Sequence, residues 1–263
     1  MELPKREKNS HKGTYGRAFI LAGSSGMLGA AILCSRGALR VGAGLVYLGV
    51  PRSSQDIVNI ATPEVIVIGG NNFFDSALKA DALAIGPGLQ NRKTIAKNLL
   101  FNLNQKAYNK PIVLDADGIL ELTQLTKLTK LTKLITPHPG EMARLLNISS
   151  SEVQKDRQKI AKEVAKKING VVVLKGHQTV IADQYGKVGI NQTGKPGMAS
   201  GGVGDVLTGM IAGLLAQGLP PFKAAELGVY LHGLAGDLAA KAKGEHFMIA
   251  SDLIDHISEA IKV

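Results

Sequence analysis

The sequence contains one cysteine, no tryptophan and 4% aromatic residues, and these shortages exclude several classes of protein. A single cysteine cannot form an internal disulfide, and Cys34 lies in an apolar stretch where we expect a buried thiol. No run of about 18 apolar residues is present to span a bilayer, and the polar first residues do not resemble a signal peptide. We therefore expect a soluble, cytoplasmic protein that does not bind membranes.

Acidic residues are also scarce, since 21 aspartate and glutamate residues stand against 31 lysine and arginine residues, for a net charge of +10. This balance favours anionic partners without distinguishing nucleic acid from phosphorylated metabolites. Few aromatic rings are available to stack on bases, so we predict that the chain does not bind nucleic acid. The basic residues near the start are interpreted as part of a solvated arm rather than as phosphate contacts; they are Lys5, Arg6, Lys8 and Lys12.

The sequence does contain short apolar runs separated by helical patterns. Near-continuous runs of valine, isoleucine and leucine are typical of strands in a parallel sheet that is covered on both faces. They predict an α/β fold of three layers, α/β/α, with a mostly parallel central sheet. No linker divides the chain, so we expect an N-terminal arm over residues 1–16 and a single domain over 17–263. The predicted strands are 19–22, 45–50, 65–68, 83–85, 112–114 and 171–174.

Two helices have clear patterns. Over residues 152–169 the apolar side chains share one face, Ser149 and Glu152 have the spacing of a capping box, and Gly170 follows. Residues 206–217 are apolar on nearly all sides, which predicts a buried helix.

A Leu-Thr-Lys triplet repeats over residues 122–134. Leucines at every third position drift around a helix by roughly 60° per step, because a turn takes about 3.6 residues. Such a pattern cannot maintain one apolar stripe. We therefore expect a short helix and an irregular surface turn.

Two glycine motifs resemble nucleotide-binding fingerprints without meeting their requirements. Residues 23–29 read G-x-x-G-x-x-G, as in short-chain dehydrogenases, but no tyrosine has the lysine four residues later that such an oxidoreductase needs. In addition, Arg52 stands where an acidic residue would follow the next strand. Residues 189–195 read G-x-x-x-x-G-K, but Pro196 supplies neither a hydroxyl for Mg²⁺ nor an N–H for a phosphate. We reject both interpretations.

Residues 194–205 are more informative. Their glycines allow successive backbone N–H groups to turn toward one oxygen-rich ligand, and the following helix adds its positive N-terminal end, so a phosphate is favoured here. Asp205 would repel an anion, but it suits a base that takes a proton from a hydroxyl attacking a phosphoryl group. The alternative, that Asp205 only caps the helix, is equally open on these residues.

Polar residues follow two other apolar runs. Asp115 and Asp117 come directly after 112–114, where open α/β sheets place their ligands, and are candidates for organising water or a metal. His138 and Glu141 stand in a turn held by two prolines, and they lack the third nitrogen or sulfur ligand of a zinc site.

Seven blocks of the chain, taken in order, resemble those of the stand-alone bacterial NAD(P)H-hydrate dehydratases, a family of the ribokinase-like superfamily. One departure is Lys195, where the family has asparagine. The blocks are 11–17 leading into 23–24, 29–31 with 40–44, 86–89, 114–117, 136–141, 174–176 with Thr179, and the glycine loop that ends at Asp205.

The resemblance implies an ADP-dependent hydro-lyase that returns (S)-NADHX and (S)-NADPHX, the hydrated forms of NADH and NADPH, to NADH and NADPH. The hydrate hydroxyl would be phosphorylated by ADP with Mg²⁺, phosphate would then leave, and AMP would be released. The resemblance also implies a homotetramer. Because residues 1–16 alone precede the domain, we expect no epimerase domain. Two other hypotheses remain open: a kinase of a small alcohol such as hydroxyethylthiazole, and a non-catalytic protein that binds nucleotides or nucleic acid.

The resemblance also implies roles for individual residues. Asp205 would be the catalytic base and a substrate contact. Ala30, Gly88 and His138 would also contact the substrate, and Glu141 would help to organise Mg²⁺ indirectly. Two loops would bind the adenine nucleotide; they comprise Lys175, Gly176, His177, Gln178 and Thr179, and Gly201, Gly202, Val203 and Gly204.

Overall fold

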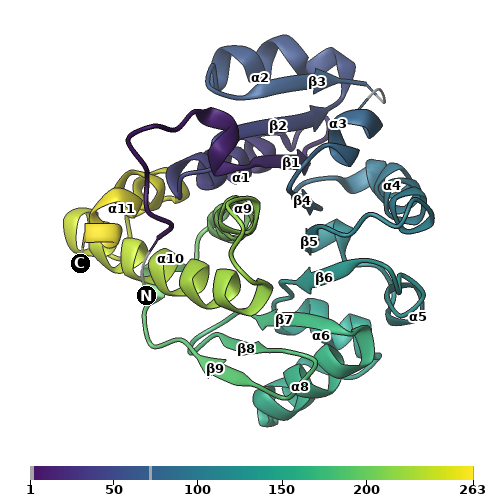
Figure 1. Cartoon of the computed structure of the whole chain (residues 1–263). Helices are drawn as coiled ribbons and strands as arrows, with labels where there is room; N and C mark the ends of the chain where they lie inside the picture. The colour runs from purple at the N-terminus through teal and green to yellow at the C-terminus, as the bar shows by residue number, and fades with distance from the viewer. Residues whose placement is uncertain (1–2, 71–72, 263) are drawn as a thin grey trace.

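The computed structural model describes residues 3–70 and 73–262; residues 1–2, 71–72 and Val263, which belong to the expected arm and domain, lie outside the described residues. Within these ranges a nine-stranded sheet has the order β3-β2-β1-β4-β5-β6-β7-β8-β9 (Figure 1). Strands β1 to β7 pair in parallel, and β8 and β9 are antiparallel. The strands are β1 (Arg17–Leu21), β2 (Leu45–Val50), β3 (Ile66–Gly69), β4 (Ala82–Ile85), β5 (Pro111–Leu114), β6 (Thr132–Ile135), β7 (Gly170–Leu174), β8 (Val180–Ala182) and β9 (Val188–Ile190).

Helices cover both faces of the sheet, which confirms the three-layer prediction (Figure 1). One face packs against α1 (Leu28–Arg40), α2 (Gln55–Ala61), α9 (Val203–Ala216), α10 (Pro221–Lys243) and α11 (Ala250–Lys262). The other packs against α3 (Phe74–Leu78), α4 (Lys93–Gln105), α5 (Leu122–Leu125), α6 (Pro139–Leu146), α7 (Ser150–Lys155) and α8 (Arg157–Ile168). Short 3₁₀ turns cover Lys12–Tyr15, Arg52–Ser54, Gln90–Arg92, Ala116–Gly118 and Pro196–Met198.

Alternate residues of each central strand belong to opposite cores. In β1, Ile20 packs with the α1 and α9 side, whereas Phe19 and Leu21 pack with the α4 side, and all three are fully buried. A strand buried on both faces needs apolar residues at every position, which explains its continuous apolar run.

The helix predicted over 152–169 is wrong in one respect, because the structure has two helices there. Asp156 leaves the helical conformation (φ −147°, ψ 71°), and its side chain accepts a hydrogen bond from the N–H of Lys159, which caps α8. The capping box of Ser149 and Glu152 is confirmed. The second helix ends at Asn169 in the left-handed region, and Gly170 already belongs to β7.

The repeat over 122–134 forms a short helix followed by an irregular turn over 126–131, as predicted, and the threonines and lysines of that turn are exposed. Leu125, Leu128, Leu131 and Leu134 are all buried, and the last triplet enters β6, a strand that the apolar runs did not reveal. The chain passes from helix to turn to strand within the repeat, so each leucine can reach the core despite the drift. The sequence prediction also missed β8 and β9, which have three residues each.

Helix α9 is buried almost throughout, as predicted, and packs closely against α1. A Cβ added at Gly209 would lie 1.8 Å from the carbonyl oxygen of Cys34, so only glycine permits this approach. Cys34 itself is buried, and burial raises the pKa of its thiol. No helix among the described residues is long and apolar enough to cross a membrane.

Candidate active site

The loops that carry the predicted site residues gather at one edge of the sheet. Because β1 to β7 run parallel, the segments after β1, β4, β5, β6 and β7 all leave from the same edge. Neighbours β2 and β4 flank β1, so the chain reverses its direction of travel across the sheet beside β1. Open α/β sheets bind ligands at such a switch point. Helix α9 packs against β1, β4 and β5 (Figure 1), and its first turn lies beside Lys175 in the loop after β7.

The first turn of α9 presents backbone N–H groups rather than a side-chain cap. Its N-cap is Gly202, which has a left-handed conformation (φ 87°). A Cβ there would lie 2.4 Å from Cδ1 of Leu33. Asp205 is the third residue of the helix, so the alternative that it is merely the cap is wrong. Unpaired N–H groups at a helix start attract anions.

A buried histidine holds this turn in place. Nε2 of His232, on α10, lies 2.8 Å from the carbonyl oxygen of Val203. Burial lowers the pKa of His232 to about 4, so the ring is neutral at pH 7 and donates this hydrogen bond.

A buried ion pair lies beside the helix start. Nζ of Lys175, after β7, is 2.7 Å from Oδ1 of Asp115, after β5, and 3.9 Å from Oε2 of Glu141. Oδ2 of Asp115 accepts a hydrogen bond of 2.8 Å from the hydroxyl of Thr208 on α9. A Cβ at Gly204 would lie 3.4 Å from Nζ of Lys175, so the lysine ammonium lies against the first turn of α9.

These neighbours shift the pKa of Asp205. Burial, followed by the negative charges of Asp115 and Glu141, raises it to about 6, although the ammonium of Lys175 acts in the opposite direction. Burial alone would lower the pKa of Lys175, but the charges of Asp115 and Glu141 outweigh burial and raise it. The site therefore contains a permanent cation beside a carboxyl group that titrates close to neutral pH, as a general base requires.

His138 and Glu141 form a capping box at the start of α6. Nδ1 of His138 accepts the N–H of Gly140 at 3.0 Å, and Oε2 of Glu141 accepts the N–H of His138 at 2.7 Å. The proton of the neutral ring is therefore on Nε2. The N–H of Lys175 donates to the carbonyl of Pro137 at 2.9 Å, which ties this turn to the loop after β7.

Gly88 and Ala30, both predicted substrate contacts, lie side by side. Gly88 has a positive φ of 63°, and a Cβ there would lie 2.9 Å from Cβ of Ala30. The hydroxyl of Ser24 donates to the carbonyl of Gly88 at 2.8 Å, so the loops after β1 and β4 are joined.

The structure thus brings together Asp205, Lys175, Gly204 and Glu141, with His138 attached through Glu141. Asp115 belongs to this group, whereas Asp117 is directed to Lys93 and to the N–H of Gln90. In the predicted nucleotide loops, Thr179 and Val203 are buried and Gly202 is partly exposed. The exposed members are Gly176, His177, Gln178 and Gly201.

Sequence reasoning missed three polar residues at this edge. Thr208 lies within an apolar helix, and its hydroxyl among apolar residues was the single sequence feature that could have indicated a role at the site. Nη1 of Arg92 donates to the carbonyl of Gly23 at 2.8 Å, and Arg157 contacts the loop after β7. Neither arginine has a sequence signal, since each is one of 31 basic residues.

The oxygen donors at the site suit Mg²⁺ held partly by a nucleotide's phosphates, rather than a metal ion held by protein side chains alone. Among residues 3–70 and 73–262 no cluster of three or more histidine, cysteine or acidic side chains could hold a metal ion. Both oxygens of Asp115 are engaged by Lys175 and Thr208. Mg²⁺ uses one or two carboxylates together with phosphate oxygens and waters, and Glu141, beside Lys175, could hold such an ion through water.

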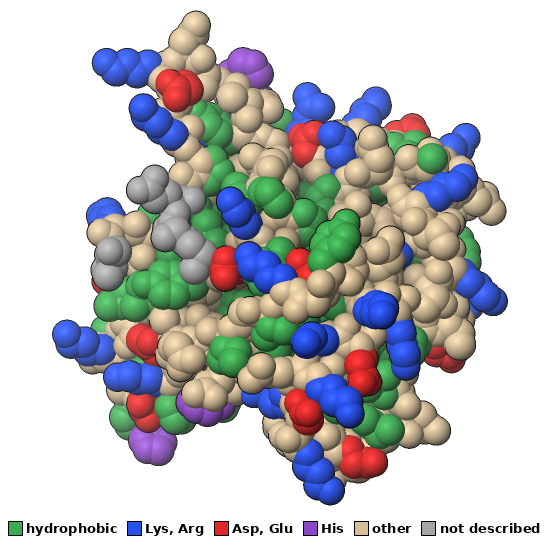
Figure 2. Space-filling model, turned by 60° about the horizontal axis from the view of Figure 1, so that its bottom comes forward, with side chains coloured by type: hydrophobic (Ala, Val, Ile, Leu, Met, Phe, Trp, Pro, Cys, Tyr) green, Lys and Arg blue, Asp and Glu red, His purple; other side chains and the backbone are tan. Residues whose placement is uncertain are grey.

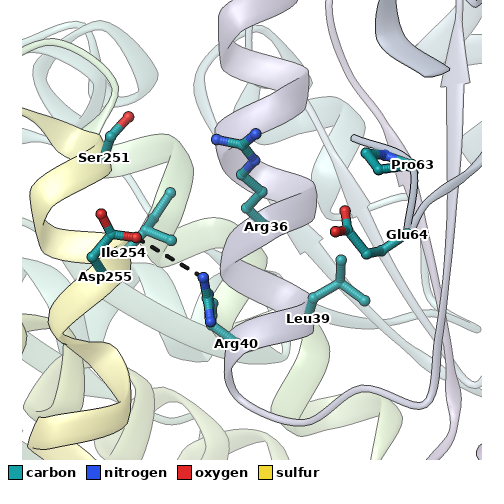
Figure 3. Close-up of a pocket in the computed structure, with 8 residues that line it drawn as sticks. All are labelled: Arg36, Leu39, Arg40, Pro63, Glu64, Ser251, Ile254 and Asp255. Atoms are coloured by element: carbon teal, nitrogen blue, oxygen red, sulfur yellow. Dashed lines mark ion pairs between the residues drawn. The ribbon is translucent and has the colours of Figure 1, made fainter. Parts of the chain in front are cut away.

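A hollow of about 470 Å³ lies elsewhere, between the C-terminal half of α1, helix α11 and the turn before β3 (Figure 3). Arg40 and Asp255 face each other across it, at 3.9 Å. None of the predicted site residues lines this hollow; its lining residues are Arg36, Leu39, Arg40, Pro63, Glu64, Ser251, Ile254 and Asp255.

The mostly parallel nine-stranded sheet, covered by helices on both faces, defines an α/β protein with the three-layer architecture expected of the ribokinase-like superfamily. The family model for NAD(P)H-hydrate dehydratase matches residues 18–259. The chain therefore belongs to the NAD(P)H-hydrate dehydratase family.

Individual relatives agree with this assignment. The chain is 43% identical to the bifunctional NAD(P)H-hydrate repair enzyme of Moorella thermoacetica, over 99% of this chain and 52% of that protein. It thus spans about half the length of the bifunctional relatives. It is 38% identical to the ADP-dependent (S)-NAD(P)H-hydrate dehydratase of Bacillus subtilis, over 96% of this chain and 91% of that one.

The fold agrees as well. The crystal structure of the ADP/ATP-dependent NAD(P)H-hydrate dehydratase of Bacillus subtilis, co-crystallised with ATP and Mg²⁺, superposes with a TM-score of 0.85 at 35% identity. The superposition covers 99% of this chain and 94% of that chain. The predicted ribokinase-like fold is confirmed.

Proposed function

We propose that this chain catalyses the ADP-dependent dehydration of (S)-NADHX and (S)-NADPHX to NADH and NADPH, a lyase reaction that releases AMP and phosphate. The observation that supports it most directly is Asp205, a carboxylate with its pKa raised to about 6 at the start of α9, beside Lys175. A simple anion-binding site would not need a base there. The names of the Moorella and Bacillus relatives supply the substrate.

In the first step, Asp205 takes the proton of the hydrate hydroxyl while the hydroxyl oxygen attacks the β-phosphorus of ADP. The bond between the β-phosphorus and the bridging oxygen breaks, and AMP leaves with the electron pair. The N–H groups at the start of α9 and the ammonium of Lys175 stabilise the negative charge on the transferred phosphoryl oxygens. A hydroxyl group is a poor leaving group, because it would depart as hydroxide, and this step converts it into a phosphate ester.

In the second step, the lone pair of the ring nitrogen forms a C=N bond, and phosphate is expelled as the ring double bond is restored with loss of a proton. Ala30, Gly88 and His138 would contact the hydrated nucleotide, and the two loops around Lys175 and Gly204 would hold ADP. Mg²⁺, when bound, supplies positive charge to the phosphate oxygens. Glu141 would hold it through water, because its own Oε2 already accepts the N–H of His138.

The rival hypotheses have weaker support. A small-alcohol kinase shares the glycine loop and aspartate, but the family match favours the dehydratase. On the face drawn in Figure 2, lysine and arginine side chains are scattered among acidic ones rather than gathered into one continuous patch. This distribution does not favour nucleic-acid binding on that face. The homotetramer and the cytoplasmic location remain predictions.

The test is to incubate the protein with prepared hydrates of NADH, ADP and Mg²⁺ and to follow the recovery of reduced-nicotinamide absorbance. AMP and phosphate should form in equal amounts with NADH. Phosphorylated hydrate that accumulates without NADH would indicate a kinase instead, and the absence of any nucleotide-dependent change would contradict the proposal.

A further inference from the structure

Arg157, the first residue of α8, holds the backbone of the loop after β7. Its guanidinium donates to three carbonyl oxygens, those of Leu174 at 2.8 Å, Lys175 at 3.2 Å and His177. A planar guanidinium offers several donors in a fixed geometry, so it can define the relative positions of three acceptors that a lysine could not reach together.

The loop sequence is adapted to this contact. Gly176 has φ of 138°, and a Cβ there would lie 3.1 Å from Nη2 of Arg157, so the glycine leaves room for the guanidinium. The hydroxyl of Thr179 donates to the carbonyl of Gly176 at 2.9 Å. Side-chain donors therefore engage four successive carbonyls, those of residues 174 to 177.

The guanidinium of Arg157 is partly buried against the loop rather than free in solvent. Nε of Arg157 is buried with no hydrogen-bond partner among the described residues, and the pKa of the guanidinium is lowered by burial. Burial of the charged guanidinium costs solvation free energy, and the hydrogen bonds to the carbonyl oxygens offset this cost. The interruption at Asp156, which separates α7 from α8, places Arg157 in the first turn of α8, next to the loop.

We propose that Arg157 is a positioning residue for the adenine nucleotide. It acts through the loop of residues 175–179. It fixes the shape of this loop before the nucleotide binds, and it thereby aligns the side chain of Lys175 with Asp115. This inference rests on the proposed function, because that function assigns nucleotide binding to the loop. A preformed loop binds more tightly, since its ordering does not have to occur on binding.

The experiment compares Arg157→Gln and Arg157→Lys with Lys159→Gln, which removes one charge from an exposed position of the same helix. Arg157→Gln should raise the KM for ADP by roughly 10-fold or more, because charge-assisted hydrogen bonds are lost. The KM for the hydrate should rise much less than the KM for ADP, because Ala30 and Gly88 lie on loops that Arg157 does not contact and only the turn of His138 is joined to the loop it holds. Arg157→Lys should have an intermediate effect, and Lys159→Gln almost none.

Two further measurements accompany the kinetics: hydrogen exchange, which reports the order of the loop, and calorimetry, which reports ADP binding. Hydrogen exchange of the ligand-free protein should be faster in residues 175–179 of Arg157→Gln and unchanged in β1 and β2. Calorimetric titration with ADP and Mg²⁺ should show the same weakening as KM. Unchanged exchange and ADP affinity in a folded Arg157→Gln protein would overturn the inference, as would equal weakening by Lys159→Gln. A wild-type protein that does not bind ADP would contradict the proposed function itself.

If Arg157→Gln does not fold, Arg157→Lys decides the question with the same readouts. Faster loop exchange and weaker ADP binding at an unchanged melting temperature would support the positioning role. Equal increases in both KM values, or exchange that rises across the whole molecule, would show that the residue stabilises the fold alone.

Discussion

The ammonium of Lys175 lies 2.7 Å from Oδ1 of Asp115, whose side chain is only 2% exposed, and the pair lies beside the first turn of α9. The two charges of this pair act in opposite directions on the pKa of Asp205. The charge of Asp115 raises the pKa of Asp205, and the charge of Lys175 lowers it. Burial adds to the effect of Asp115, so the net shift is upward and Asp205 titrates where a base is useful.

Asp205→Asn should lower kcat by about 10²-fold or more, because the amide keeps the shape of the side chain but cannot accept the hydroxyl proton. ADP binding, measured by calorimetry, should persist because backbone N–H groups hold the phosphates. Asp56→Asn, at an exposed position on α2, is the matched control. Retained turnover in Asp205→Asn would remove Asp205 from the mechanism.

The pH dependence follows from the raised pKa of Asp205. Below about pH 6 the carboxyl group is protonated and cannot act as a base, so kcat/KM should fall about tenfold per pH unit on the acid side. Asp115→Asn removes a neighbouring negative charge, so the acid limb should move to lower pH. A limb that stays in place, or moves upward, in a folded Asp115→Asn protein would contradict this coupling.

ADP should be a better phosphoryl donor than ATP. A site that places the β-phosphoryl group in line with Asp205 leaves no equivalent position for a third phosphate, and a displacement of about 1 Å can cost about 10²-fold in rate. The comparison is kcat/KM for the two donors at saturating Mg²⁺. A preference for ATP would reverse the donor assignment and leave the fold unaffected.

Lys133 should destabilise the protein at neutral pH. Its side chain is buried, its Nζ donates to the carbonyl of Leu128, and burial lowers its pKa to about 8. Between about pH 8 and the unfolded value of 10.5 the unfolded chain binds more protons, so this group's contribution to stability rises with pH across that window.

Lys133→Met should therefore increase the free energy of unfolding at pH 7, by on the order of 3 kcal/mol at most. The gain should shrink as the pH rises toward 10, and denaturant titrations at several pH values measure it. Lys130→Met, at an exposed position in the same segment, should change little. A gain that does not depend on pH would mean that packing, and not the charge, was responsible.

A mixture of hydrate epimers should be consumed until one epimer remains. Asp205 and the phosphoryl group must both be in line with a single hydroxyl, and the site can present only one configuration in that way. By family resemblance the S form is used. Chromatographic separation of the epimers during the reaction measures this, and loss of both at comparable rates would contradict the proposed geometry.

The sequence by itself determined the elements whose signals are local. The apolar run at 45–50 forms β2 with the predicted bounds, the capping box of Ser149 and Glu152 begins α7, and the glycine loop leads into α9 with Asp205 in its first turn. These features depend on side-chain periodicity, on caps and on backbone freedom over a few residues, so they can be predicted without knowing the fold.

The tertiary structure alone decided how these pieces interact. Asp115 meets Lys175 across 60 residues and Thr208 across 93, contacts that depend on the order of strands in the sheet and on the position of α9 over it. The raised pKa of Asp205 requires this convergence, because burial and neighbouring charges produce it. The contacts of Arg157 are also tertiary: the pattern over 152–169 predicted one helix, whereas the structure has two, and the second begins with Arg157 in contact with the loop after β7.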